Sequence, residues 1–222
     1  MRLSFIVPTL DEAAGIERCL GRLQDARGRG HEVVVVDGGS RDATPALARP
    51  LADRVLSAPR GRATQMNAGA AAARGDGLVF VHADTLLAAD ADGEVAAALA
   101  RAAWGRFDVR IAGRHRLLRV IAATMNLRSR LSGIATGDQA IFVRRAVFEA
   151  LGGYAAIPLM EDVELSRRLR RRAWPRCLRT RVETSGRRWE RRGVLRTVAL
   201  MWRLRLAYWF GADPVRLAER YR

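Results

Sequence analysis

Three apolar runs near the start of the chain are each followed by acidic side chains, and this arrangement limits the possible folds more than any other feature. The runs and their acids are residues 3–7 with Asp11 and Glu12, 33–36 with Asp37, and 78–81 with Asp84. Strands that are apolar on both faces are typical of buried, largely parallel sheets. The carboxyl ends of such strands form the ligand crevice of open α/β proteins. Carboxylates gathered there can hold a cation over a bound phosphate, so we expect a nucleoside diphosphate site at this edge.

Strand and helix patterns alternate through the first hundred residues. The predicted strands are residues 3–8, 32–37, 53–58 and 77–82. The predicted helices start near residues 11 and 42 and span 62–74 and 87–103. In the first of these helices, Ile16, Leu20 and Leu23 share one face. This order requires right-handed crossovers and predicts an α/β fold with a mixed, mostly parallel sheet flanked by helices.

The second half of the chain predicts a mixed α and β continuation. Residues 107–111 alternate like a half-exposed strand, 115–131 are predicted to be helical, and 139–143 are predicted to form a buried strand. Residues 161–172 are predicted to form a helix with Leu165 and Leu169 inward and a run of arginines toward solvent.

Residues 194–210 are the most apolar stretch outside the strands. Arg196, Arg203 and Arg205 interrupt it, so it lacks the roughly 18 uncharged residues of a membrane-spanning helix. One predicted helical face carries Leu195, Val198, Ala199, Trp202, Leu206 and Trp209. Our first interpretation is that this face docks on the core of the domain. The alternative is that it lies in a membrane interface, where aromatic and arginine side chains suit an amphipathic helix.

Composition narrows the class of protein. A chain of 222 residues suits one domain with a short extension. The net charge of +16 arises from arginine alone, since the chain has no lysine, and we attribute it to GC-rich coding rather than to a nucleic-acid surface. Cys19 and Cys177 lie far apart and are predicted to be reduced thiols. Met1 and Arg2 lead directly into the first strand with no signal-peptide pattern, so we expect a cytoplasmic protein.

Four segments, in this order and spacing, resemble glycosyltransferase family 2. They are residues 6–12, 36–44, 82–84 and 161–162. Each segment alone is a weak match, but four in order are a strong one, and the resemblance extends from residue 1 to about 190. It implies a GT-A fold with a nucleotide-binding half over residues 1–103 and an acceptor half over 104–190, followed by an amphipathic helical extension over 191–222. It also implies inverting transfer of a sugar from a nucleoside diphosphate donor to a hydroxyl acceptor, which would be a small molecule or lipid-linked.

The resemblance implies a set of residues that bind the donor nucleotide. They are Pro8, Thr9, Glu12, Asp37, Gly39, Arg62, Asn67, His82 and Ala83. The carboxylates suit the N–H and hydroxyl donors of base and ribose, and Arg62 suits the diphosphate. Simpler roles remain open: Glu12 as a charge near a helix start, Asp37 as a turn residue, and Arg62 and Asn67 as surface residues.

The third segment corresponds to the D-x-D motif of the family. Its last residue, Asp84, would coordinate Mg²⁺ or Mn²⁺, which stabilises the charge of the leaving nucleotide. This chain departs from the motif because His82 stands in place of the first aspartate. Histidine binds Mn²⁺ better than Mg²⁺. The role of His82 is therefore open among metal contact, nucleotide contact and a buried structural residue.

The fourth segment is implied to supply the base. An inverting transfer needs one carboxylate to take the proton of the attacking hydroxyl. The resemblance assigns this role to Asp162 and orientation of the acceptor to Glu161, whereas the simpler alternative is a pair of charges at a helix start. Asp138, Arg188 and Trp189 are the implied acceptor contacts, with a turn role as the alternative for Asp138.

Other classes of function fit less well. A dinucleotide-binding oxidoreductase needs G-x-G-x-x-G after the first strand, where this chain has Pro8 to Glu12. A nucleotidyltransferase acting on a sugar phosphate would share strand-end acids and Mg²⁺, but the expected glycine- and basic-rich loop is absent. A non-catalytic basic module for membranes or nucleic acid is the third alternative. No helix-turn-helix, RNP or zinc-ligand signature supports specific nucleic-acid binding.

Overall fold

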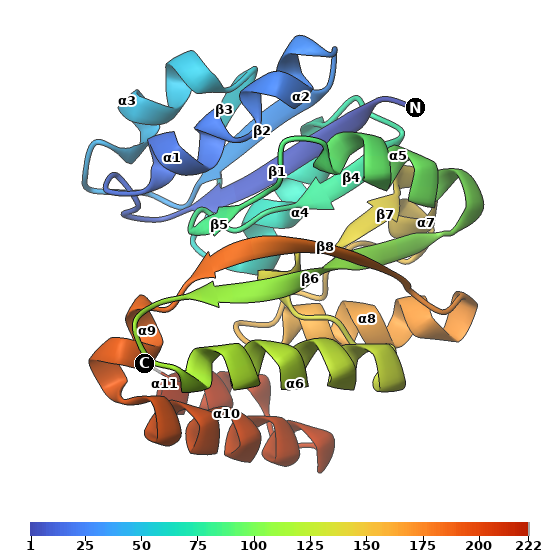
Figure 1. The fold of residues 1–222 in the computed structure, drawn as a ribbon. Coiled ribbons are helices and arrows are strands. Elements are labelled where there is room, and N and C mark those ends of the chain that lie inside the picture. Colours follow the sequence, from blue (N-terminus) through green and yellow to red (C-terminus); the bar gives the residue numbers. More distant parts are fainter. Residues whose placement is uncertain (222) are drawn as a thin grey trace.

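The computed structural model describes residues 1–221 and is built around one sheet of eight strands (Figure 1). The strands are β1 (Leu3–Thr9), β2 (Glu32–Asp37), β3 (Arg54–Ser57), β4 (Gly77–Phe80), β5 (Thr85–Leu86), β6 (Trp104–Ala112), β7 (Phe142–Arg144) and β8 (Arg176–Ser185). Their order across the sheet is β3-β2-β1-β4-β7-β6-β8-β5. β3, β2, β1 and β4 are parallel, β7 is antiparallel to both of its neighbours, and β8 is parallel to β6 and antiparallel to β5. The predicted mixed, mostly parallel sheet is confirmed.

Helices cover both faces of this sheet (Figure 1). They are α1 (Ile16–Gly21), α2 (Gln24–Gly28), α3 (Thr44–Ala48), α4 (Arg62–Ala72), α5 (Ala91–Arg101), α6 (Leu117–Ser132), α7 (Arg145–Ala150), α8 (Glu161–Arg172), α9 (Arg187–Arg192), α10 (Val194–Trp209) and α11 (Pro214–Tyr221), with short 3-10 turns η1 (Arg49–Leu51) and η2 (Gly137–Gln139). Because successive strand residues point to opposite faces, Phe5 and Val7 pack with α1, α5 and α6, whereas Ile6 packs with α4, α7 and α8. The sheet is therefore buried on both sides, as the apolar runs predicted.

The parallel strands bring their carboxyl ends to one edge. Thr9 pairs with Asp37 across β1 and β2, and Asp37 pairs with Ser57 across β2 and β3. The acids after β1 and β2 therefore start from the same edge of the sheet, as predicted.

The single helix predicted from residue 11 is wrong. Asp11 has a left-handed backbone with φ of 53°. The N–H groups of Asp11, Glu12 and Ala13 donate to side chains of residues 40–44 rather than to a helix. Two short helices, α1 and α2, follow instead. The inward face was predicted correctly, because Ile16, Leu20 and Leu23 are buried.

The predicted half-exposed strand at 107–111 is also wrong in its burial. β6 is buried at every residue except Arg110 and Ala112. Arg106 is completely buried and pairs with Asp108, which also accepts a hydrogen bond from Arg130 at 2.8 Å. Charged residues that looked solvent-facing in the sequence thus satisfy one another inside the protein.

Two further strands differ from prediction. The strand predicted at 139–143 is shortened to β7, because Gln139 lies in η2 and Ala140 has a φ of 45°. β8 was not predicted, since arginines at 176, 179 and 181 break its apolar pattern. As predicted, Cys19 and Cys177 are free thiols, and Leu165 and Leu169 of α8 are buried.

The C-terminal helices dock through a different face of α10 than the first interpretation predicted. Leu195, Trp202, Leu206 and Trp209 are 58–75% exposed, whereas Val194, Thr197 and Leu204 are buried. Leu204 of α10 and Leu217 of α11 form a small apolar cluster with Leu159 and Met160. The predicted boundary between residues 190 and 191 falls inside α9, and the division there stays a prediction. Among residues 1–221, no helix is long and apolar enough to cross a membrane.

Candidate active site

The loop after β2 is organised by the carboxylate of Asp37. Its Oδ2 accepts hydrogen bonds from the N–H groups of Gly39 (3.0 Å) and Ser40 (2.9 Å). Its Oδ1 accepts hydrogen bonds from the hydroxyls of Ser40 (2.5 Å) and Thr9 (3.3 Å). Gly39 has a φ of 88°, which favours glycine at this turn. Asp37 therefore has the turn role considered above, and a direct nucleotide contact stays a prediction.

Gln65 of α4 ties the ends of the two central strands together. Its buried side-chain amide donates to the carbonyl oxygens of Thr9 and Val36, both at 2.8 Å. Pro8 lies in β1 opposite Val36 and is buried. Satisfied buried polar groups of this kind make a strand end rigid. The predicted nucleotide edge is thus a fixed platform rather than a loose loop.

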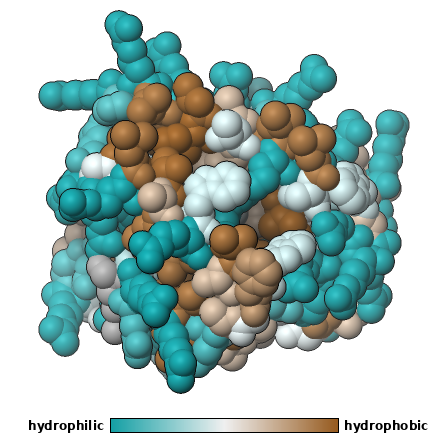
Figure 2. Space-filling view, turned by 90° about the horizontal axis from the view of Figure 1, so that it is seen from below, coloured by the Kyte–Doolittle hydropathy of each residue, from teal (hydrophilic) through white to brown (hydrophobic). Residues whose placement is uncertain are grey.

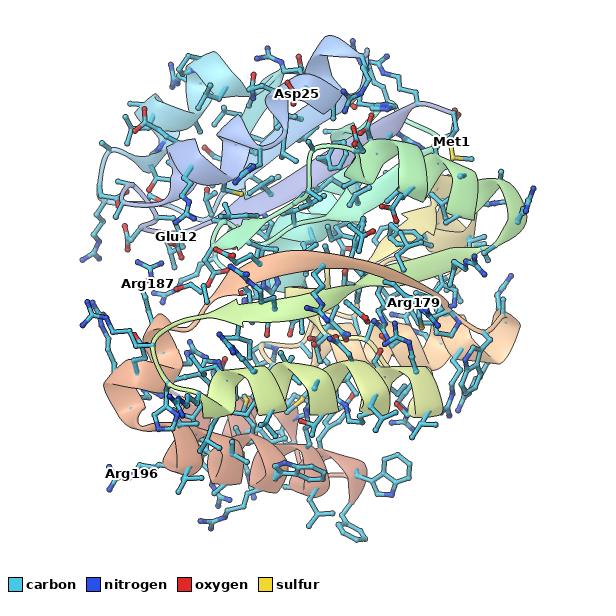
Figure 3. All side chains as sticks on the ribbon, viewed as in Figure 1. Met1, Glu12, Asp25, Arg179, Arg187 and Arg196 are labelled. Carbon is cyan, nitrogen blue, oxygen red and sulfur yellow. The ribbon has the colours of Figure 1, made fainter. Side chains whose placement is uncertain are left out.

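Glu12 lies opposite Arg187, which begins α9 (Figure 3). Its Oε2 is 3.5 Å from Nη2 of Arg187. Burial and the nearby charge of Asp84 raise the pKa of Glu12, while Arg187 lowers it. The acids predicted from the ends of β1 and β4 therefore lie close enough to interact, and α9 supplies the opposing charge.

Asp84 lines a basic cavity of about 280 Å³. Ser185 and four arginines of α9, Arg187, Arg188, Arg191 and Arg192, complete its lining. No described residue donates a hydrogen bond to the Asp84 carboxylate, and no three acidic, histidine or cysteine side chains among residues 1–221 form a metal-binding group. Hard oxygen donors of this kind fit Mg²⁺ or Mn²⁺ when phosphates and waters complete the coordination. The surrounding guanidinium groups suit those same phosphates.

His82, two residues before Asp84, packs against η2. Its Nδ1 lies 3.5 Å from Oδ1 of Asp138, and a side chain at Gly137 would collide with the imidazole ring. Burial lowers the pKa of His82, but the hydrogen bond and charge of Asp138 outweigh it, so the net shift is upward. Ala83, by contrast, is buried in the core beside α1. The predicted nucleotide residue His82 and the predicted acceptor residue Asp138 are thus direct neighbours.

The acid pair opens α8 at the wall of a second cavity. Both oxygens of Asp162 are held by backbone N–H groups, Oδ2 by Gly137 at 2.8 Å and Oδ1 by Val163 at 2.7 Å. Glu161 is 3% exposed, and its Oε1 lies 3.8 Å from Nη1 of Arg62. Burial and the adjacent charge of Asp162 raise the pKa of Glu161 to about 7. The two acids have different environments, one fixed by amides and one desolvated, which is common in proton-transfer sites.

The remaining predicted residues fall into two groups. Asn67 is fully engaged by the backbone of Tyr154, donating to its carbonyl and accepting from its N–H, both at 2.9 Å. It anchors the segment that leads to Glu161, and lining of the donor site by Asn67 stays a prediction. Arg188 stacks over the ring of Tyr221 at 4.3 Å, and Trp189 lines the cavity of the acid pair.

The structure therefore brings most of the predicted site together, and it adds residues that the sequence did not single out. Gln65, Arg187 and Arg128 are the additions. Gln65 lies in the helix predicted at 62–74, but no role was predicted for it. In a chain with 39 arginines, no local pattern marks Arg187 or Arg128.

Comparison with known proteins identifies the family. The profile of glycosyl transferase family 2 matches residues 4–152, which is more than half of the chain. The chain belongs to glycosyl transferase family 2. Within this family 2 chain, the matched region includes the strand-end acids, His82 and Asp84, whereas Glu161 and Asp162 lie beyond it.

Several solved structures have folds similar to that of this chain. TarS residues 1–349 of S. aureus share 18% identity over 84% of this chain and 61% of that one, with a TM-score of 0.67. The mannosyltransferase PcManGT of Pyrobaculum calidifontis, in complex with GDP-Man and Mn²⁺, shares 22% identity over 99% of this chain and 68% of that one, also at 0.67. Glucosyl-3-phosphoglycerate synthase of Mycobacterium tuberculosis, with Mg²⁺ and UDP, shares 19% identity over 82% of this chain and 70% of that one, with a TM-score of 0.59.

The family 2 chain spans about three-fifths of the length of the TarS structures it matches. A comparison with curated protein sequences found no match. The solved structures establish the GT-A fold of this domain.

Proposed function

We propose that this family 2 protein transfers a sugar, with inversion, from a nucleoside diphosphate donor to a hydroxyl acceptor. One observation carries the proposal. His82, two residues before Asp84, contacts Asp138, and the neighbouring Gly137 donates a hydrogen bond to Asp162. This series of contacts supports neighbouring positions for the proposed diphosphate site and the proposed base, as a direct displacement requires.

The donor would lie across the carboxyl ends of β1, β2 and β4. Glu12 and the loop organised by Asp37 would meet base and ribose, and Arg62 and Arg188 would pair with the diphosphate. Asp84 would hold Mg²⁺ or Mn²⁺, which when bound neutralises charge on the leaving diphosphate. The structures of PcManGT with GDP-Man and Mn²⁺ and of the synthase with UDP and Mg²⁺ support this choice of donor and metal.

The acceptor hydroxyl would be deprotonated by Asp162. Amide N–H groups fix the orientation of its carboxylate, so that it can meet a hydroxyl that enters the cavity of the acid pair. Glu161, buried beside Arg62, would orient the acceptor. Asp138 and Trp189 line the same cavity and would contact the acceptor too.

We further propose that the reaction takes place at the cytoplasmic face of a membrane, with residues 194–210 in peripheral contact. Exposed Leu195, Trp209 and Phe210, together with nearby arginines, support this placement. A nucleotidyltransferase on this scaffold would leave the buried acid pair without a role, and a purely binding module would have no need for it.

Incubation of the protein with UDP-, GDP- and dTDP-sugars and Mn²⁺ tests the proposal. We expect release of one nucleoside diphosphate and a product whose anomeric configuration, read from the proton coupling in NMR, is opposite to that of the donor. Retained configuration would contradict the inverting mechanism. Consumption of a nucleoside triphosphate and a sugar phosphate instead would establish the nucleotidyltransferase alternative.

A further inference from the structure

The cavity of the acid pair does not end at the polar residues. Its volume is about 380 Å³, within the range of roughly 300–1,000 Å³ that is usual for small-molecule sites. Glu161, Asp162, Asp138 and Arg62 line one end. From there the cavity continues between α6 and α10, where most of the lining side chains are apolar and Thr124 and Arg205 are the polar exceptions beside Arg128.

We call this continuation the apolar groove. It is lined by Ile121 and Met125 of α6 and by Met201, Trp202, Leu206 and Trp209 of α10. Trp202, Leu206 and Trp209 are 67%, 58% and 75% exposed. Figure 2 looks onto this side of the molecule, where hydrophobic side chains gather in patches that hydrophilic side chains surround. Large exposed apolar patches with a polar rim mark binding sites.

Arg128 lies where the polar end meets the apolar groove. It belongs to α6 and lines the cavity, and the charge of Asp162 acts on it. Its Nε and Nη2 are buried and have no hydrogen-bond partner. Guanidinium donors that are buried and unsatisfied are costly unless a ligand satisfies them. An anionic group of a bound molecule would do so.

Resting on the proposed function, we infer that the acceptor is an amphiphile. Its hydroxyl lies at Asp162, an anionic group near it pairs with Arg128, and its hydrocarbon chain lies in the apolar groove. Two observations favour this occupant. The groove is continuous with the candidate base, so whatever fills it reaches the reacting end. Arg128, whose buried donors are unsatisfied, lines the same cavity as the acids and the apolar side chains, which matches the groups of such a molecule.

The test uses single-chain probes in the absence of any membrane. Dansylaminoundecanoic acid binds with a change in fluorescence, and n-alkanoic acids displace it while they are kept below their critical micelle concentrations. We expect affinity to rise about three- to fourfold per methylene, from about six to about fourteen carbons, until the groove is full. Leu206→Arg should reduce the affinity for the longest chains at least tenfold. Leu131→Arg is the matched control, because Leu131 is 73% exposed on α6 and does not line the groove.

Alkanols of the same chain lengths carry no negative charge, so they test whether Arg128 binds the anionic group. The protein should bind alkanoates more tightly than alkanols, and Arg128→Gln should remove this preference while the dependence on chain length stays. Affinity that does not depend on chain length, or that falls equally in both leucine variants, would overturn the inference. Binding to anionic vesicles without binding to monomeric chains would overturn it as well.

Titration of the same preparations with UDP, GDP and dTDP separates this inference from the proposed function. If the protein binds a nucleotide but no alkanoate, the inference of an amphiphilic acceptor is overturned and the proposed function stands. If the protein binds alkanoates but none of the nucleotides, the proposed function is contradicted, and so is the assignment of the bound molecule as its acceptor.

Discussion

Gly137 donates its N–H to Oδ2 of Asp162 over 2.8 Å, and there is no room for a side chain on Gly137 because the ring of His82 packs against it. This contact fixes the distance between the two halves of the candidate site. His82 follows β4 at the edge predicted to bind the donor, whereas Asp162 belongs to α8. The short turn η2 therefore transmits the position of the donor residues to the candidate base.

Replacement of the candidate base should separate binding from turnover. We predict that Asp162→Asn lowers the rate of nucleoside diphosphate release with acceptor by about 10²–10⁴-fold and leaves the Kd of the donor within about twofold. Glu164→Gln, on the same helix but paired with Arg168, should keep the rate. Full activity of Asp162→Asn would remove this residue from the role of base.

The stability of the protein should depend on pH through Glu161. Its pKa is raised to about 7 from 4.5, so the folded state holds the proton more tightly than the unfolded state. The stabilisation is complete below about pH 4.5 and is lost as pH rises to about 7. Glu161→Gln should therefore raise the free energy of unfolding by roughly 2–3 kcal/mol at neutral to alkaline pH relative to the wild type, and much less in acid.

Urea denaturation at several pH values measures this effect. Glu149→Gln provides the control, since Glu149 has a side chain that is 62% exposed in a surface ion pair. A difference between Glu161→Gln and wild type that does not change with pH would show that desolvation of Glu161 is not its cause.

The interaction of His82 with Asp138 should be visible by NMR. Asp138 holds the pKa of His82 above its ordinary value against the effect of burial. Asp138→Asn removes this hydrogen bond and charge, so burial and the charge of Arg62 outweigh the charge of Asp84, and the pKa of His82 should fall below about 6.5. Titration of the carbon-bound protons of the His82 imidazole measures this pKa. An unchanged pKa of His82 would contradict the contact.

The C-terminal helices should depend on Leu204 for their docking. Leu204 is 2% exposed and packs with Leu159 and Met160, directly before Glu161. Leu204→Ala should cost about 2–4 kcal/mol, whereas Leu195→Ala, at a residue 73% exposed, should change stability by less than about 0.5 kcal/mol. Chemical denaturation of both variants checks this. Equal effects would show that α10 is not anchored at Leu204.

The sequence predicted what apolar periodicity and short motifs can encode. The parallel strands and the inward faces of α1 and α8 follow from local pattern, and so does the meeting of the strand-end acids at one edge. Patterns failed where charged residues are buried in pairs. Asp108 made the strand at 107–111 look half-exposed, because its partner Arg130 lies 22 residues further along the chain.

Sequence patterns were limited in the same way in predicting the candidate site. Motifs led to Asp84, Glu161 and Asp162, but the contact of Gly137 with His82 depends on packing between distant segments. The docking face of α10 was predicted wrongly because periodicity identifies the most apolar face, and here that face borders a groove rather than the core. Hydrophobic pattern alone cannot distinguish a core contact from a ligand surface.

Calorimetric titration with UDP, GDP and dTDP tests the central claim most directly. It is run with Mn²⁺ and then with a chelator, on the wild type and on Asp84→Asn. We predict micromolar binding of one nucleoside diphosphate that weakens at least tenfold on chelation. In Asp84→Asn that dependence on metal should be lost, whereas it should persist in Asp90→Asn, since Asp90 is exposed and makes no capping hydrogen bond. Absence of binding by all three nucleotides, or equal metal dependence in Asp84→Asn and wild type, would contradict a donor site at this edge of the sheet.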